Sequence, residues 1–139
     1  MHLYMAKEAL TSTIRLEYRE DRILRITILP NSRIDIQQAR QNWETAARLI
    51  GNIRVAVLVD ATAEHQLTRL AQEYASEQSH HRVAMAVVTQ STITRLLTTL
   101  YVAIFRPAIP VKLFSSASAA ESWLNQQLLD EEMEQRIAG

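Results

Sequence analysis

Two apolar segments constrain the fold of this chain more than any other feature. Residues 55–59 read VAVLV and residues 83–88 read VAMAVV, with no polar residue at alternate positions. Strands that are covered on both faces have such continuous apolar sequences, and they occur mainly in parallel sheets flanked by helices. Successive parallel strands need a long crossover connection, which is usually a helix. We therefore predict an α/β fold in which these two segments are buried parallel strands.

The segments around these two strands alternate between the strand and helix periods. Residues 13–19 and 23–29 carry apolar side chains at every second position, as half-buried strands do. The short polar turn between them predicts an antiparallel hairpin, and residues 111–114 (VKLF) predict one more short strand. Apolar stripes at helical spacing lie between these strands and after the last one, at 36–50, 67–75, 93–104 and 120–128.

The resulting order is β-β-α-β-α-β-α-β-α, which predicts a single α/β domain with right-handed crossovers. Its mostly parallel sheet is predicted to have five strands, with the first strand, 13–19, antiparallel at one edge. Asp35 is the predicted N-cap of the first helix, and Ser118 opens a capping box for the last. Trp43 and Trp123 lie on apolar helical stripes, so both are predicted to be mostly buried.

The length of 139 residues fits one domain. We place this domain at residues 13–129, between a loose N-terminal segment at 1–12 and a polar C-terminal tail at 130–139. The chain begins without the layout of a signal peptide, and it has no apolar run near the ~18 residues that a spanning helix needs. We therefore expect a cytoplasmic protein with no membrane span.

The composition excludes several classes of function. Fifteen basic side chains balance fifteen acidic ones, so the net charge gives no reason to expect binding to nucleic acid. No cysteine is present, which excludes disulfides, thiolate nucleophiles and cysteine-ligated metals. The adjacent His80 and His81 lack the spacing of a metal-binding pair on a helix. Gly51 and Gly139 are the two glycines, too few for a phosphate-binding loop. We predict no metal and no cofactor.

Three polar residues are candidates for a binding site at the carboxyl ends of the parallel strands, where ligands bind in open α/β sheets. Asp60 follows the 55–59 strand and could accept a hydrogen bond from a ligand or partner, or from its own loop, and we favour the local role. Thr62 is either a ligand contact or the cap of the second helix. Arg95 lies near the start of the third helix, where anions bind, although many such arginines are surface residues.

The end of the third helix is apolar on almost every side. Residues 99–105 read TLYVAIF, and Tyr101, Val102 and Phe105 lie off the stripe that is expected to face the core. A helix that is apolar all round is either deeply buried or covered by something else. We predict that these three residues form a homodimer interface. The alternative is that a loop or residues 1–12 cover them within one chain.

Two segments carry a family resemblance. They are VAVLVD at 55–60, which leads into a loop and a helix, and IPVKLFSSASAAESWL at 109–124. Together with the element order, they resemble the STAS-like superfamily, which includes bacterial anti-sigma-factor antagonists. Lipid-transfer proteins of the CRAL-TRIO type have a related fold. The resemblance covers about residues 13–129 and is strongest to an uncharacterised bacterial branch with a Pro-hydrophobic-Lys-hydrophobic-Phe strand and an Ala-x-x-Trp-Leu helix.

The phosphorylation switch of the antagonists does not carry over to this chain. Those proteins have an Asp-Ser-Ser-Gly type sequence at the start of the helix after the central strand, whereas this chain reads DATAEHQLTRLA there. We therefore expect a non-catalytic STAS-like domain that acts through protein–protein interaction in a regulatory role. Two alternatives stay open. One is a protein that binds a small or hydrophobic ligand, and the other is an enzyme with a strand-end site built from Asp60, Thr62, His65 and Arg95.

Overall fold

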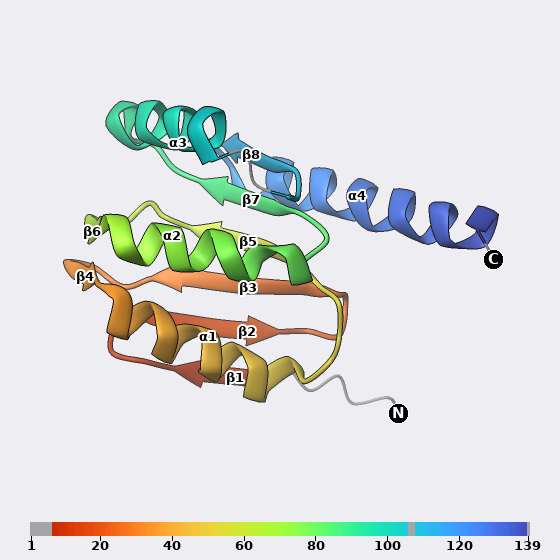
Figure 1. The fold of residues 1–139 in the computed structure, drawn as a ribbon, viewed down its shortest axis with the longest axis horizontal. Coiled ribbons are helices and arrows are strands. Elements are labelled where there is room, and N and C mark those ends of the chain that lie inside the picture. The colour runs from red at the N-terminus through yellow and green to blue at the C-terminus, as the bar shows by residue number, and fades with distance from the viewer. Residues whose placement is uncertain (1–6, 106–107, 139) are drawn as a thin grey trace.

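The computed structural model describes residues 7–105 and 108–138, and at positions 100, 101 and 103–105 it describes the backbone alone (Figure 1). Six strands form the main sheet, in the spatial order β1 (Lys7–Leu10), β2 (Ile14–Tyr18), β3 (Ile23–Ile28), β5 (Ala56–Asp60), β7 (Met85–Val88) and β8 (Val111–Phe114). A small parallel pair, β4 (Ser32–Ile34) and β6 (His65–Leu67), forms a second sheet. The helices are α1 (Ile36–Ile50), α2 (Arg69–Gln78), α3 (Thr92–Phe105) and α4 (Ala117–Ala138), with a 3-10 turn, η1 (Ser79–His81), after α2.

The predicted α/β architecture with a mostly parallel sheet is confirmed. β3, β5, β7 and β8 pair in parallel, and β2 and β3 form the predicted antiparallel hairpin. The predicted count of five strands is wrong, because β1 pairs antiparallel with β2 and takes the edge position from it. Residues 7–10 are thus part of the sheet and not of a loose segment. The sequence of β1 is KEAL, and of its side chains only Ala9 is half-buried, so this strand has no apolar alternation to reveal it.

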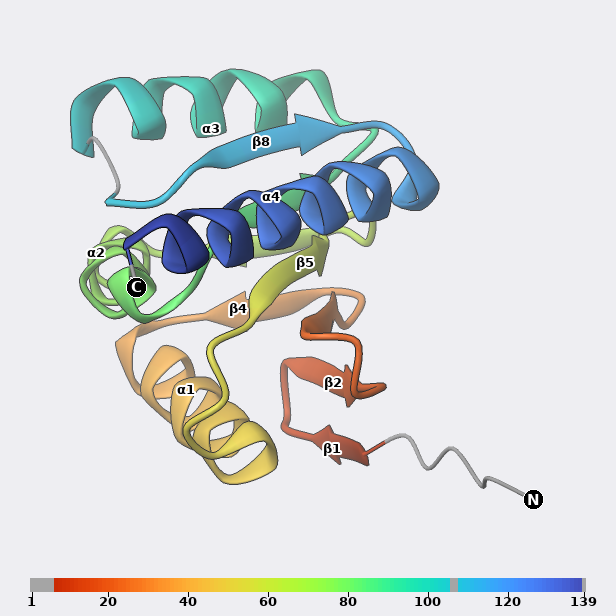
Figure 2. The ribbon, with the colours of Figure 1, turned by 90° about the vertical axis from the view of Figure 1, so that its right-hand side faces the viewer.

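Helices cover both faces of the sheet. α1 and α2 lie on one face, above Leu16, Leu24 and Val57. α3 lies on the same side, at the end of the sheet formed by β7 and β8 (Figure 1). α4 crosses the opposite face over β5 and β7 (Figure 2), where it buries Ala120 and Leu124.

Small side chains in the strands let α4 approach the sheet closely. Ala56 and Ala86 are completely buried beneath this helix. Ala120, Leu124 and Leu128 repeat at every fourth position of α4, so they fall on one face of it and are all buried. The match between small strand residues and a helical leucine stripe accounts for the tight packing of this face.

The start of α4 differs from its sequence prediction. Ser116 caps this helix, because its Oγ accepts a hydrogen bond from the backbone N–H of Ala119 at 3.2 Å, whereas Ser118 lies inside the helix. Glu121, the other half of the predicted capping box, forms an ion pair with Arg25 of β3 at 3.3 Å instead. The Glu121 carboxylate therefore links α4 to the sheet and does not cap the helix.

The predicted polar tail, 130–139, is wrong as a separate segment, because α4 continues as far as Ala138. Glu131 lies 3.1 Å from Arg22 and 2.9 Å from Arg54, and its side chain is only 15% exposed. Arg22 and Arg54 precede β3 and β5, so these ion pairs join the second half of α4 to the ends of two central strands. The last turns of the helix are exposed, as the charge pattern predicts.

Of the predictions about single residues of the helices, the cap of α1 is confirmed and the burial of the two tryptophans is not. Asp35 caps α1 as predicted, since its side chain accepts a backbone hydrogen bond from the first turn at 2.9 Å. Trp43 and Trp123 are half-buried and not mostly buried as predicted. Trp43 lies beneath Arg82, and Trp123 packs against Phe114 with 5.7 Å between ring centres. Trp43 lines two open spaces of the molecule, so part of its ring stays exposed.

Candidate functional site

The predicted polar residues at the carboxyl end of β5 form a local turn. The Oδ1 atom of Asp60 accepts hydrogen bonds from the backbone N–H of Thr62 at 3.0 Å and from its hydroxyl at 2.6 Å. Asp residues commonly make such bonds in turns. Thr62 does not cap α2, because Thr68 occupies the cap and accepts a hydrogen bond from the backbone N–H of Ala71 at 3.3 Å.

Arg95 and His65 are not bonded to this turn within the described part of the chain. Arg95 is exposed in α3, where the hydroxyl of Ser91 caps the helix. His65 lies in β6, and its Nδ1 atom is 2.8 Å from a carbonyl oxygen of the preceding loop. Among the described residues no cluster of three or more His, Asp or Glu side chains could hold a metal ion. None of the described helices is long and apolar enough to cross a membrane.

An apolar groove of about 390 Å³ lies between the main sheet and the helices α1, α2 and α3. Its floor includes Ile26, Val59 and Val87, from the neighbouring strands β3, β5 and β7. Tyr74 of α2 and Leu97 of α3 line its sides. Most of its other lining residues are apolar as well, so the groove is suited to an apolar occupant.

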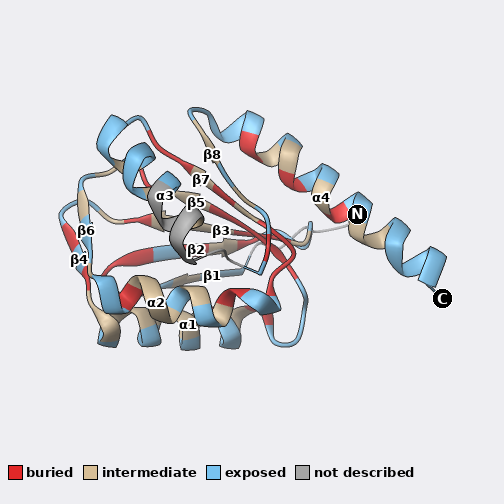
Figure 3. Ribbon diagram, turned by 45° about the horizontal axis from the view of Figure 1, so that its top comes forward, coloured by how far each residue is buried: buried red, intermediate tan, exposed pale blue. Residues whose placement is uncertain are grey.

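The first half of α3 is more exposed than its sequence predicts. Ile93, Leu96 and Leu97 were expected on the core stripe, but they are 71, 60 and 58% exposed. Figure 3 shows the start of α3 mostly in pale blue, the colour of exposed residues. α3 packs chiefly on β8, which is the edge strand of the sheet. Little sheet surface therefore lies beneath this helix, and its apolar face is only partly covered.

The predicted dimer interface falls on the second half of the same helix. Val102 is half-buried. The side chains of Tyr101 and Phe105, and those of Leu100 and Ile104 on the predicted core stripe, lie outside the described residues. The homodimer therefore stays a prediction.

The apolar stripe of the second helix also differs from its prediction. Leu67 and Leu70 are 41 and 59% exposed, whereas Ala71 is completely buried. Leu67 precedes the helix and belongs to β6, which pairs with β4 and not with the main sheet. The predicted stripe thus combines one residue of a strand with residues of the helix that follows it.

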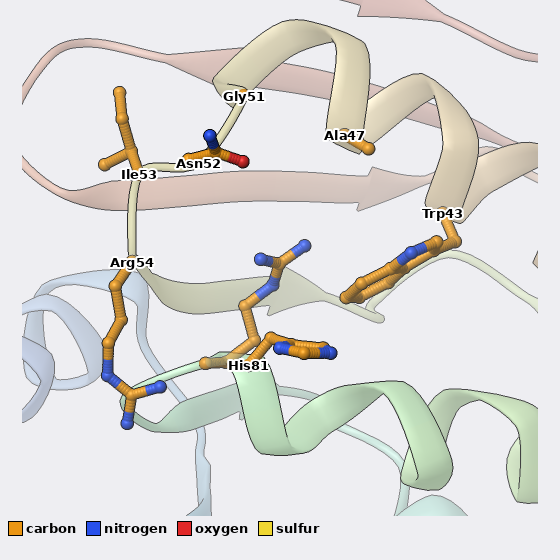
Figure 4. Close-up of a pocket in the computed structure, with 8 residues that line it drawn as sticks. Trp43, Ala47, Gly51, Asn52, Ile53, Arg54 and His81 are labelled. Atoms are coloured by element: carbon orange, nitrogen blue, oxygen red, sulfur yellow. The ribbon is translucent and has the colours of Figure 1, made fainter.

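A second cavity, of about 350 Å³, lies at the amino ends of β5 and β7 (Figure 4). Arg82 is only 7% exposed, and its guanidinium carbon lies 4.3 Å from the centre of the Trp43 ring. Burial lowers the pKa of Arg82 from its usual value, because desolvation disfavours the charged form. Arg54 and His81 line the same space. We call this space, lined by Arg54, His81, Arg82 and Trp43, the cationic cavity.

Sequence reasoning did not find the cationic cavity. Its residues come from α1, from the loop before β5 and from the turn after α2, and none of them belongs to a motif with fixed spacing. The local signal is the basic run His80, His81 and Arg82 directly before a buried strand. This basic run does not predict a binding site by itself, because Trp43 and Arg54 come beside it only in the folded chain.

The comparisons with known proteins agree with this fold. Residues 17–128 match the family described as a domain of unknown function, DUF7793. A comparison with curated proteins finds no match. Among solved structures, the chain is similar to an uncharacterized protein of the DUF3478 family from Shewanella loihica that has a SpoIIAA-like fold. The TM-score is 0.61 at 17% identity, over 89% of this chain and 98% of that one. This likeness confirms the predicted STAS-like architecture, and the matched residues show that the chain belongs to the DUF7793 family.

Proposed function

We propose that this chain is a non-catalytic STAS-like domain that acts through protein–protein interaction, with α3 as the binding surface. The observation that carries this proposal is the exposure of Ile93, Leu96 and Leu97, which lie on one face of the helix. Contiguous exposed apolar surface is typical of interaction sites. A partner that covered these side chains would gain roughly 25 cal/mol for each Å² of apolar surface removed from water.

The arrangement at the strand ends supports a non-catalytic role. General acid–base catalysis needs groups that converge on one reacting atom. Asp60 is instead bonded to Thr62 in its own turn, and neither His65 nor Arg95 is bonded to that turn within the described chain. The loop also lacks the serine motif of the phosphorylated antagonists that the chain resembles, so regulation by that switch is not part of the proposal.

We take the partner to be a second copy of this chain. A net charge of zero at pH 7 gives little long-range repulsion between copies. Two-fold pairing is the commonest form of association, and it would bring the same apolar face of α3 together from both subunits. Tyr101, Val102 and Phe105, the residues predicted for the interface, belong to the same helix but lie off the stripe of Ile93, Leu96 and Leu97, so the contact proposed here is centred on the first half of α3.

Sedimentation equilibrium of the double variant Leu96→Glu with Leu97→Glu tests this proposal. The wild-type chain should be a dimer, and the variant a folded monomer, because two charges without partners would lie in the interface. Ile137→Glu on α4 is the matched control, since Ile137 is 83% exposed on a different helix. The control should remain a dimer. A wild-type chain that stays monomeric at high micromolar concentration would refute the proposed self-association.

The apolar groove supports a second candidate, the binding of a hydrophobic ligand. Its volume of about 390 Å³ is within the range of roughly 300–1,000 Å³ that is common for ligand sites. Native mass spectrometry of the purified protein separates the two functions. An additional mass that is lost on denaturation would support the ligand, whereas a complex of two unmodified chains would support the dimer.

A further inference from the structure

Arg82 is a buried cation without a carboxylate partner in the described chain. All fifteen Asp and Glu residues lie in the described segments, and none of the ion pairs there includes Arg82. The hydrogen bonds that arginine side chains donate within the described chain all come from other arginines. A buried charge that is left unpaired is costly, so the position of this arginine calls for a physical explanation.

The donors of Arg82 open into a cavity and not into packed protein. No polar side-chain atom of the described chain is both fully buried and without a partner, so the unpaired guanidinium nitrogens reach open space. Arg82 and Trp43 line both this cavity and the neighbouring apolar groove. The Trp43 ring, 4.3 Å from the guanidinium carbon, supports the group from one side. A fixed and partly desolvated guanidinium group is well suited to bind a carboxylate or phosphate through two parallel hydrogen bonds.

Two arginines, Arg54 and Arg82, line the cationic cavity, and no acidic residue is among its lining side chains. In Figure 4 the guanidinium group of Arg54 extends away from Trp43, so Arg54 lies at the edge of the cavity. Arg54 donates from Nε to Glu131 at 2.9 Å and from Nη1 to a carbonyl oxygen at 3.4 Å. Its Nη2 atom makes no hydrogen bond within the described chain, so this arginine retains a donor for a ligand.

The size and the apolar wall of the cavity indicate that the anion carries an organic group. Trp43 and Ile53 supply apolar surface beside the arginines. The volume of about 350 Å³ falls in the range of roughly 300–1,000 Å³ that holds small organic ligands. A bare oxyanion would leave most of this space and all of the apolar wall unused.

The geometry points to a binding site for a small aromatic oxyanion, a planar ring that carries a carboxylate or phosphate group. Arg82 binds the oxyanion through two hydrogen bonds, Arg54 adds a second positive charge, and the ring lies against Trp43 and Ile53. The bound anion supplies the charge partner that Arg82 lacks in the chain alone. The site goes beyond the proposed function, because it uses the amino ends of the strands and no residue of α3.

The test is an NMR titration that follows the indole N–H signals of the two tryptophans. The probes are benzoate and phenyl phosphate. Inorganic phosphate and phenol are the controls, because each carries only one part of phenyl phosphate, the anion or the ring. Benzoate or phenyl phosphate should shift the Trp43 signal until saturation, with a dissociation constant near about 1 mM or below. Trp123 is the internal control, since it packs against Phe114 on the opposite face of the sheet and its signal should not move.

Arg82→Gln should weaken the binding about 10- to 100-fold, the range expected for losing charge-assisted hydrogen bonds. Arg69→Gln is the control, because Arg69 is an exposed arginine on α2 outside the cavity, and it should bind as the wild type does. If Arg82→Gln does not fold, Arg54→Gln replaces it and should weaken binding by a smaller factor. The proposal is overturned if neither aromatic anion shifts Trp43, if the cavity variants bind as the wild type does, or if phenol or inorganic phosphate alone binds as well as phenyl phosphate.

Discussion

The two faces of the main sheet bury their apolar residues to different extents. On one face, α4 covers β5 and β7 so closely that Ala120 and Leu124 are completely buried. On the other face, the apolar groove remains under α1, α2 and α3, and Leu97 is still 58% exposed. α3 has the more apolar sequence of the two helices, yet the described side chains of its first half are largely exposed. An apolar helix face is buried only where a matching surface lies beneath it, and the unmatched face is where we expect binding.

Leu124→Ala gives the largest expected effect, because it opens a cavity in the closed face. We expect a loss of about 2–5 kcal/mol in the free energy of unfolding, measured by urea denaturation. Leu129→Ala on the same helix is the control, since Leu129 is 54% exposed and should change the stability by less than about 0.5 kcal/mol. Equal effects of the two substitutions would contradict the tight packing of α4 on the sheet.

Glu131→Gln tests the polar contacts that complete the closed face. Glu131 joins α4 to Arg22 and Arg54, so losing its charge should lower the free energy of unfolding by about 1 kcal/mol. Glu134→Gln removes one exposed charge from the same helix and should have almost no effect. If added salt removes the difference between the two variants, the ion pairs of Glu131 are the cause. A Glu131→Gln variant as stable as Glu134→Gln would mean that the second half of α4 is not held by these pairs.

Leu97→Ala, on the open face, should have the smallest effect on stability. Most of this side chain is exposed in the single chain, so we expect less than about 0.5 kcal/mol in the same urea experiment at a protein concentration low enough for the chain to be monomeric. Compared with Leu124→Ala, this is the same substitution on the opposite side of one sheet. A loss above about 2 kcal/mol would show that α3 is buried within the single chain, and it would remove the basis for the proposed interface.

Local sequence patterns predicted correctly the features that depend only on residues close together in the chain. The strand at 111–114 has the predicted bounds, and Asp35 caps α1 as its position before an apolar stripe predicts. Ser118 does not cap α4 because the helix already begins at Ala117, where Ser116 is the cap. Glu121 pairs instead with Arg25 of β3, a contact that no local pattern specifies. β1 was missed because backbone pairing at a sheet edge requires no particular side chains.

The candidate sites were less predictable than the fold. Asp60 was expected to bond within its own loop, and the structure has that bond, because it depends on residues two positions apart. The basic run that contains Arg82 did not predict a site, because the role of Arg82 depends on Trp43 and Arg54, which are far from it in the sequence.

The sequence by itself determined the order of the four helices and of the five strands β2, β3, β5, β7 and β8, the parallel centre of the sheet and the absence of thiol chemistry. These properties follow from the period of the apolar residues and from composition, which are present in the chain before it folds. Only the tertiary structure decided which apolar faces are covered and where a cation is left without a partner. The physical reason is that burial and charge pairing depend on the distance between segments far apart in the chain, and the hydrophobic period of one segment contains no information about the surface that it will meet.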